Sequence, residues 1–143
     1  MELVLLDTNI VIDFFNGIPQ AADEVAKHDD IAISVITWLE VLAGVHSDPD
    51  AERQTKAQLA SFTVHPLEVG AVADRTVALR SASFAPGAKK LPIPDAIIKA
   101  TADVHGRILV TRNTRDFGFP DVRIPYQVQI DANGKLTVFD VKA

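Results

Sequence analysis

The chain has 143 residues, the size of one domain, and its 48% hydrophobic and 23% charged residues are typical of a folded globular protein rather than a disordered one. It contains no cysteine, which excludes disulfides, thiolate zinc sites and cysteine nucleophiles. The net charge of -5 argues against a simple basic nucleic-acid-binding protein. We find no apolar run long enough to span a membrane and no signal peptide, and we therefore expect a cytoplasmic protein.

The first half of the chain alternates short apolar runs with segments of helical periodicity. The apolar runs suit strands that are buried on both faces, as in a parallel sheet. We expect these strands over 3–6, 31–33 and 63–64. The expected helices begin near Ile10, after the capping segment Asp7–Asn9, and cover 21–27, 35–45 and 51–61.

The second half continues the alternation and then changes character. Helices are expected over 69–83 and 94–105, and a strand over 107–111. In the last twenty residues, apolar and polar residues alternate around Asn133-Gly134, which is the signal of a two-residue hairpin turn. The sequence therefore predicts an α/β fold with a mainly parallel sheet, followed by a C-terminal hairpin-like extension.

Four acidic residues follow the predicted strands at positions that favour one common site. Asp7 comes directly after the first strand, and Asp116 lies a few residues after the strand over 107–111. Glu40 is in the helix after the second strand, and Asp95 begins the helix after a proline-rich loop. Ligands of open α/β sheets bind beyond the carboxyl ends of the strands, so we expect these side chains to converge there.

Such a cluster indicates a particular chemistry. Two carboxylates about 4 Å apart repel each other by roughly 4 kcal/mol at an effective dielectric constant of 20, so cations or protons must offset the charge. Carboxylates without histidine or cysteine suit Mg²⁺ or Mn²⁺, which also bind phosphate oxygens. The pattern therefore points to phosphodiester chemistry assisted by a metal ion.

Each of the four acids also fits a purely structural role. These roles are a helix N-cap for Asp7, a capping box for Thr37 and Glu40, an intrahelical ion pair for Asp95 and Lys99, and a capping pair for Asn113 and Asp116. A fifth acid, Asp13, lies six residues after Asp7, faces either the site or solvent, and is not counted with the four.

Four motifs in the right order resemble those of the PIN-domain nucleases, and most closely the VapC-type toxins of bacterial toxin–antitoxin systems. The first is Leu-Leu-Asp-Thr-Asn-Ile-Val-Ile-Asp over 5–13, and the second runs from Ser34 to Gly44 around Glu40. The third is Leu-Pro-Ile-Pro-Asp-Ala-Ile-Ile over 91–98, and the fourth is Leu-Val-Thr-Arg-Asn-Thr-Arg-Asp-Phe over 109–117. The resemblance covers about residues 2–125.

The resemblance implies an α/β/α sandwich over 1–125. We expect the extension over 126–143, which lies outside the resemblance, to pack on the same domain. The resemblance implies metal-dependent cleavage of RNA with Mg²⁺, or Mn²⁺, as cofactor. It also implies a homodimer and a cognate VapB-type antitoxin as partner. The implied catalytic and metal-binding residues are Asp7, Glu40, Asp95 and Asp116, and the implied supporting residues are Asn9, Thr111 and Asn113.

Two other functions stay open, and two features depart from the family pattern. Asp7 could be the nucleophile of a phosphohydrolase, although no second aspartate stands two positions later. The chain could also be a non-enzymatic module that binds RNA or a partner.

Lys99 stands where a small residue is usual, and the tail beyond Tyr126 passes the usual end of the family. Residues 80–123 hold eight basic and four acidic residues, which fits either an ordinary solvated surface or a rim that guides phosphates toward the acidic site.

Overall fold

A parallel four-stranded sheet forms the centre of the chain, whose computed structural model describes residues 2–143. The strands are β1 (Val4–Leu6), β2 (Ile31–Ser34), β3 (Thr63–His65) and β4 (Ile108–Val110). Their order across the sheet is β3-β2-β1-β4, and all neighbouring pairs are parallel. The central strand β1 is buried on both faces, as its apolar sequence predicts. The expected mainly parallel sheet is thus confirmed.

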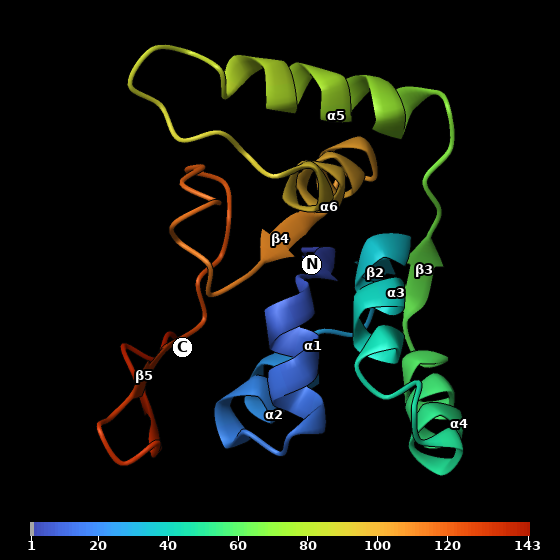
Figure 1. Cartoon of the computed structure of the whole chain (residues 1–143), viewed down its shortest axis with the longest axis vertical. Helices are drawn as coiled ribbons and strands as arrows, with labels where there is room; N and C mark the ends of the chain where they lie inside the picture. Colours follow the sequence, from blue (N-terminus) through green and yellow to red (C-terminus); the bar gives the residue numbers. More distant parts are fainter. Residues whose placement is uncertain (1) are drawn as a thin grey trace.

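Six helices cover the two faces of this sheet (Figure 1). Helices α5 and α6 lie on one face, and α1 to α4 lie on the other. The predicted α/β/α sandwich is therefore confirmed. Among residues 2–143, no helix combines the length and the apolar character needed to cross a bilayer. The helices are α1 (Thr8–Phe15), α2 (Pro19–Ala26), α3 (Val35–Ala43), α4 (Pro49–Leu59), α5 (Ala71–Ala82) and α6 (Ile93–Val104).

Strand β1 divides its three side chains between two hydrophobic cores. Val4 and Leu6 pack into the core shared with α1 to α4, whereas Leu5 packs into the core shared with α5 and α6. Successive residues of a strand point to opposite faces, so this division follows directly from the pleat. A shift of β1 by one residue would exchange the two sets, which fixes the register and therefore the place where β1 ends.

Several helix boundaries differ from the sequence prediction by one or two residues because of capping. Helix α1 begins at Thr8 rather than Ile10, since the Asp7 side chain accepts a hydrogen bond from the Thr8 backbone N–H at 2.7 Å. Helix α5 begins only at Ala71, because Gly70 adopts a φ of 150° that ends the preceding loop.

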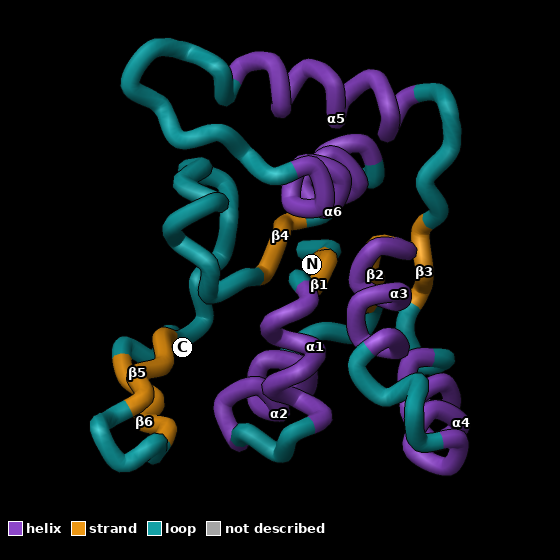
Figure 2. Tube along the Cα trace, viewed as in Figure 1, coloured by secondary structure: helices purple, strands orange, loops and turns teal. Residues whose placement is uncertain are grey.

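The C-terminal extension contains the expected hairpin, which stands apart from the main sheet (Figure 2). Its antiparallel strands are β5 (Gln127–Ile130) and β6 (Leu136–Phe139). The predicted two-residue turn at Asn133-Gly134 is wrong. The turn runs over 131–134, because the Asp131 carbonyl accepts from Gly134 N–H at 3.0 Å and the Asp131 carboxylate accepts from Asn133 N–H at 2.9 Å. Gly134 closes it with a φ of 78°.

A buried ion pair attaches the segment after β4 to α2. Glu24 is 1% exposed and accepts two hydrogen bonds from Arg123, from Nε at 2.7 Å and from Nη2 at 2.8 Å. His28 Nε2 lies 2.9 Å from the same carboxylate. At the end of the chain, Lys27 donates to the Lys142 carbonyl at 3.2 Å. We call Glu24, His28 and Arg123 the arginine clamp.

The order of the strands creates one position where a ligand site is expected. The chain passes from β1 outward to β2 and β3, and then returns across the sheet so that β4 lies on the other side of β1. In open α/β sheets, ligands bind beyond the carboxyl ends of the strands where the direction of winding reverses. Here that position lies between the ends of β1 and β4, where Asp7 and Thr111 follow the two strands.

Candidate active site

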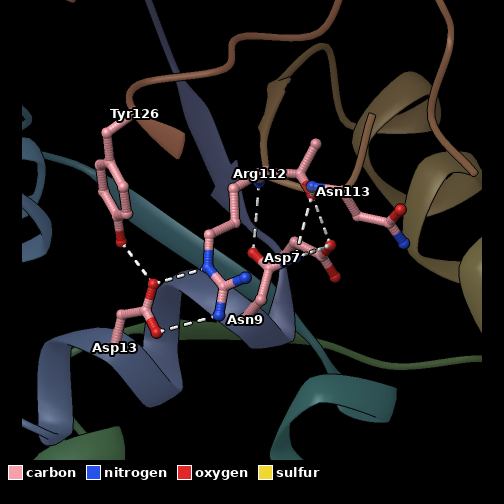
Figure 3. Close-up of polar contacts among 7 residues, drawn as sticks. Asp7, Asn9, Asp13, Arg112, Asn113 and Tyr126 are labelled. Atoms are coloured by element: carbon pink, nitrogen blue, oxygen red, sulfur yellow. Dashed lines mark hydrogen bonds and ion pairs between the residues drawn. The ribbon is translucent and has the colours of Figure 1, made fainter. Parts of the chain in front are cut away.

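Asp7 directly follows β1, and hydrogen bonds hold both of its carboxylate oxygens. Figure 3 shows Asp7 beside Asn9 and the loop that carries Asn113. Oδ1 accepts from Thr8 N–H, while Oδ2 accepts from Thr111 Oγ1 at 2.7 Å and from Asn9 Nδ2 at 3.2 Å. Burial raises the pKa of Asp7, and the hydrogen bonds from Thr111 and Thr8 oppose that rise. Asp7 is therefore both the N-cap of α1, as one alternative proposed, and a buried carboxylate at the sheet edge.

Asn9, Thr111 and Asn113 form one hydrogen-bonded network around Asp7. Asn9 Nδ2 also donates to Thr111 Oγ1 at 3.3 Å, and Asn9 Oδ1 accepts from the backbone N–H of Arg112 at 3.4 Å. Thr111 Oγ1 accepts from the backbone N–H of Asn113 at 3.0 Å. The structure thus brings together all three residues expected to support the acidic site, and it joins the start of α1 to the loop after β4.

Glu40 reaches the site through Thr8 rather than through a helix cap. Thr8 Oγ1 donates to Glu40 Oε1 at 2.8 Å and lies 3.0 Å from Thr37 Oγ1. The predicted capping box of Thr37 and Glu40 is wrong, because α3 begins earlier and Ser34 is its N-cap, accepting from Ile36 N–H at 3.1 Å. Sequence reasoning missed the linking role of Thr8, which depends on a contact between α1 and α3.

Asp116 has two partners that lie on different segments. Its backbone N–H donates to Asn113 Oδ1 at 3.1 Å, and its carboxylate accepts from Asn113 Nδ2 at 3.0 Å, so the capping-like pair is present. Its other oxygen forms an ion pair with Lys89 from the loop between α5 and α6. The hydrogen bonds from Lys89 and Asn113 lower the pKa of Asp116.

Asp95 stands in the first turn of α6 and faces the other acids. Burial raises the pKa of Asp95 to about 7, reinforced by hydrogen bonding with Asp116 and by the charges of Asp7, Asp116 and Glu40. Asp95 is therefore close enough to Asp7, Asp116 and Glu40 for their negative charges to raise its pKa. The predicted intrahelical pair of Asp95 with Lys99 is wrong.

Lys99 instead joins α6 to the loop that carries Asp116. Its ammonium pairs with Asp103 one turn along the helix and with Asp121 at 3.1 Å, and it lies 5.0 Å from the centre of the Phe119 ring. Lys99 is 3% exposed, so these contacts compensate for the burial of its charge. Lys99, which departs from the family pattern, therefore has a structural role and links α6 to the loop after β4.

A second buried carboxylate, Asp13, supports the site from behind (Figure 3). It accepts from Arg112 Nε at 2.8 Å and Nη2 at 3.2 Å, and from the Tyr126 hydroxyl at 2.8 Å. Burial raises the pKa of the Tyr126 phenol, and the hydrogen bond to Asp13 adds to the rise. Asp13 therefore faces neither the acidic site nor solvent. No signal in the sequence connects residues that are 99 and 113 positions apart.

The acidic residues have the chemistry of a site for a hard divalent cation. Their donors are all carboxylate oxygens, and within residues 2–143 no arginine is bonded to Asp7, Glu40, Asp95 or Asp116. In the described part of the chain, no three histidine or acidic side chains lie close enough together to hold a metal ion as they stand. Mg²⁺ commonly keeps several waters and binds through one or two carboxylates, so the donor set fits this ion without a complete cage.

Comparisons with known proteins agree with the fold and with the motifs. The sequence pattern of the PIN domain matches residues 4–124. The structure is similar to a toxin–antitoxin complex from Klebsiella pneumoniae, with 40% identity and a TM-score of 0.76, covering 87% of this chain and 98% of that one. It is also similar to FitAcB from Neisseria gonorrhoeae, with 25% identity and a TM-score of 0.71, covering 84% of this chain and 94% of that one.

The fold extends to more distant structures. DNA-bound VapBC from Salmonella typhimurium matches with 24% identity and a TM-score of 0.72, covering 87% of this chain and 97% of that one, and at this identity the likeness shows the fold alone. Comparison with curated protein sequences gave no significant match.

Proposed function

The chain belongs to the PIN-domain family, and on that premise we propose that it is a VapC-type, metal-dependent endoribonuclease that acts as the toxin of a type II toxin–antitoxin system. One observation carries the nuclease part of this proposal. Asp7 follows β1 where the winding of the sheet reverses, Thr8 links it to Glu40, and Thr111 and Asn113 link it to Asp116. Lys89 pairs with Asp116, whereas no cation is bonded to Asp7, Glu40 or Asp95 in the described residues, and this leaves carboxylate oxygens available to a divalent cation.

We assign the roles of the four acids from their contacts. Asp7 is the central ligand, because Thr111, Asn9 and Thr8 hold its oxygens in place. Asp95 and Asp116 face it from α6 and from the loop after β4. Glu40, held by Thr8 and more exposed than Asp7, positions the water that attacks the phosphate. When bound, Mg²⁺ or Mn²⁺ lowers the pKa of that water and offsets negative charge on the phosphate.

The partners follow from the same assignment. We propose RNA as substrate and a VapB-type antitoxin as the inhibiting partner, because similar structures are described as toxin–antitoxin complexes. We also propose that the chain acts as a homodimer. The alternative in which Asp7 is a phosphohydrolase nucleophile receives less support, since asparagine rather than a second aspartate stands two positions later.

The decisive experiment compares two helix-capping aspartates. Asp7 caps α1 at the site and Asp48 caps α4 outside it, where its carboxylate accepts from Asp50 N–H at 3.1 Å. Asparagine caps a helix about as well as aspartate, so Asp7→Asn and Asp48→Asn should both fold normally. We expect Asp7→Asn to lose at least roughly 100-fold in RNA cleavage and Asp48→Asn to keep wild-type activity, on the scale of losses at metal sites.

Cleavage is measured with purified protein by mapping RNA ends in Mg²⁺, in Mn²⁺ and in excess chelator. The chelator should abolish cleavage. Asp7→Asn protein that cuts RNA at the wild-type rate would rule out the assignment, and a phosphorylated aspartate trapped at Asp7 would favour the phosphohydrolase.

A further inference from the structure

The basic stretch over 80–123 is mostly occupied with internal ion pairs. Five of its eight cations pair with carboxylates, which leaves three without a carboxylate partner among residues 2–143. The positive charge available to guide phosphates is therefore smaller than the sequence alone indicates. It is limited to the three cations of the stretch that have no carboxylate partner. The five paired cations are Lys89, Lys99, Arg107, Arg112 and Arg123, and the three others are Arg80, Lys90 and Arg115.

Two of these three cations stand over one exposed aromatic ring. Phe84 is 53% exposed, in the segment that follows α5. The Arg80 guanidinium carbon lies 4.9 Å from the centre of its ring, and Lys90 Nζ lies 5.6 Å from it. Phe84 is about half exposed even with both cations over its ring, so part of the ring is accessible to solvent beside two positive charges.

The segment that carries Phe84 is held in place at its two ends. Arg80 Nη1 donates to the Leu91 carbonyl at 2.6 Å, and Leu91 N–H donates to Ser83 Oγ at 2.9 Å. Ser83 Oγ in turn donates to the Arg80 carbonyl at 2.6 Å, and Leu91 is buried. The Phe84 ring therefore projects from a loop whose base is fixed, which reduces the entropy lost when a ligand binds it.

The same loop borders the acidic site. Lys89, next to Lys90, pairs with Asp116, and Asp95 follows Leu91 by four residues at the start of α6. In Figure 1 this loop is the yellow segment that connects α5 to α6. A ligand that lies across Phe84 can thus continue toward the four acids without leaving the surface of this loop.

We propose that Phe84, together with Arg80 and Lys90, is a stacking platform for an unpaired base of single-stranded RNA beside the cleavage site. Aromatic rings stack on unpaired bases of any identity, while neighbouring cations bind the phosphates that connect them. A base in a duplex is already stacked and paired, so the platform selects single strands. This inference rests on the proposed nuclease function and adds a substrate-binding surface to it.

The test compares two exposed phenylalanines. Phe139 on β6 is 47% exposed and, within the described residues, has no cation over its ring, so Phe139→Leu is the matched control for Phe84→Leu. Binding of a fluorescein-labelled single-stranded RNA is measured by anisotropy with the full chain in chelator, which prevents cleavage. We expect Phe84→Leu to weaken binding by roughly tenfold, within the range known for base stacking, and Phe139→Leu to leave it unchanged.

Further variants separate stacking from charge. Phe84→Trp should keep wild-type affinity, and its indole fluorescence should fall when the RNA binds. Lys90→Gln should weaken binding and reduce its dependence on salt, whereas Lys135→Gln, at the residue just before β6, should not. Single-stranded DNA of the same sequence shows whether the ribose hydroxyl contributes, and a duplex RNA should bind equally to wild type and Phe84→Leu.

Failure of this inference is distinct from failure of the proposed function. RNA binding that depends on Phe84, without any cleavage in Mg²⁺ or Mn²⁺, would support the platform and contradict the nuclease. Cleavage by wild type with the same affinity and KM in Phe84→Leu would overturn the platform and leave the nuclease intact. A wild-type protein that does not bind the RNA, or a Phe84→Leu variant that changes only the oligomeric state, would also overturn it.

Discussion

Buried carboxylates occur in two settings in this chain, and the settings lead to opposite behaviour. In the arginine clamp, burial alone would raise the pKa of Glu24, but the hydrogen bonds from Arg123 and His28 outweigh it and lower that pKa to about 2. At the sheet edge, burial and neighbouring acids raise the pKa of Asp95 to about 7, and no cation is bonded to it in the described residues. The chain therefore has arginines to neutralise a buried acid, and it does not place them at the site.

This difference separates stability from function. A paired carboxylate contributes to folding as long as its partner is present, and Lys89 gives Asp116 such a partner. Asp7 and Asp95 are bonded to no cation in the described residues, so their negative charges cost folding free energy, which is typical of a functional site. Asp13 belongs with Glu24 in this respect, because Arg112 and Tyr126 satisfy it completely. The following predictions test whether the two settings differ as described.

The largest expected effect is at the arginine clamp. Arg123→Met removes two hydrogen bonds from the buried Glu24 carboxylate and leaves only His28 and Lys27 beside it, which should lower the free energy of unfolding by about 3 kcal/mol. Urea denaturation measures the change. Arg115→Met, at a cation without a carboxylate partner in the described residues, should stay within about 0.5 kcal/mol of wild type. Equal losses in the two variants would abolish the distinction.

The pH dependence of stability should identify the same carboxylate. The folded-state pKa of Glu24 lies below its ordinary value of 4.5, so its contribution is complete above about pH 4.5 and is lost as pH falls toward 2. We expect wild type to lose on the order of 2–3 kcal/mol from this group over that window. Glu24→Gln should be less stable than wild type at pH 7 and should show a shallower acid limb. A Glu24→Gln variant with an unchanged acid limb would contradict the lowered pKa.

The hydroxyl of Tyr126 should have a smaller effect. Tyr126→Phe removes one of the three hydrogen bonds to Asp13 while the two from Arg112 remain, so the free energy of unfolding should fall by about 1.5 kcal/mol. Thermal and urea unfolding both measure this change. RNA cleavage should fall only slightly, because the hydroxyl contacts none of the four acids. A loss of cleavage as large as that in Asp7→Asn would place Tyr126 in the catalytic machinery.

The smallest expected effect has the opposite sign. Asp95→Asn removes one charge from the cluster, and in chelator at pH 8 it should raise the free energy of unfolding by about 0.5–1 kcal/mol. The same variant should lose RNA cleavage. Asp103→Asn on the same helix is the control, because Asp103 is ion-paired with Lys99 and Arg75 and should lose stability instead. Destabilisation by both variants would mean that Asp95 is satisfied like Glu24.

The sequence predicted the positions that follow from strand ends. Asp7 follows a buried apolar run and Asp95 opens a helix after two prolines, so both were placed by local pattern. The pairings of Glu40 and Lys99 were wrong, because local spacing favoured Thr37 and Asp95 while the structure offered better partners on other elements. Local pattern reports what a residue can do within its own helix, and tertiary contacts decide between the options.

Contacts between distant segments lay beyond the sequence altogether. Two such contacts depend on how the loops return to the sheet. They are the hydrogen bond of Tyr126 with Asp13 and the two cations over the Phe84 ring. Nothing in composition or periodicity distinguishes Phe84 from Phe139, although the first has two cations over its ring. The hairpin was visible because alternation is local, but its turn was set by the Asp131 side chain.

The long separation between Asp7 and Thr111 has a consequence for protein synthesis. These residues are 104 positions apart, and β1 pairs with β4 through residues near the two ends of the domain. A ribosome adds roughly 5–20 residues per second, so a nascent chain exposes Asp7 for roughly 5–20 s before Thr111 and Asp116 are made. During that time the central strand has only one neighbour and the acidic site lacks half of its framework. The proposed site is thus complete only after β4 and the loop that follows it have been translated.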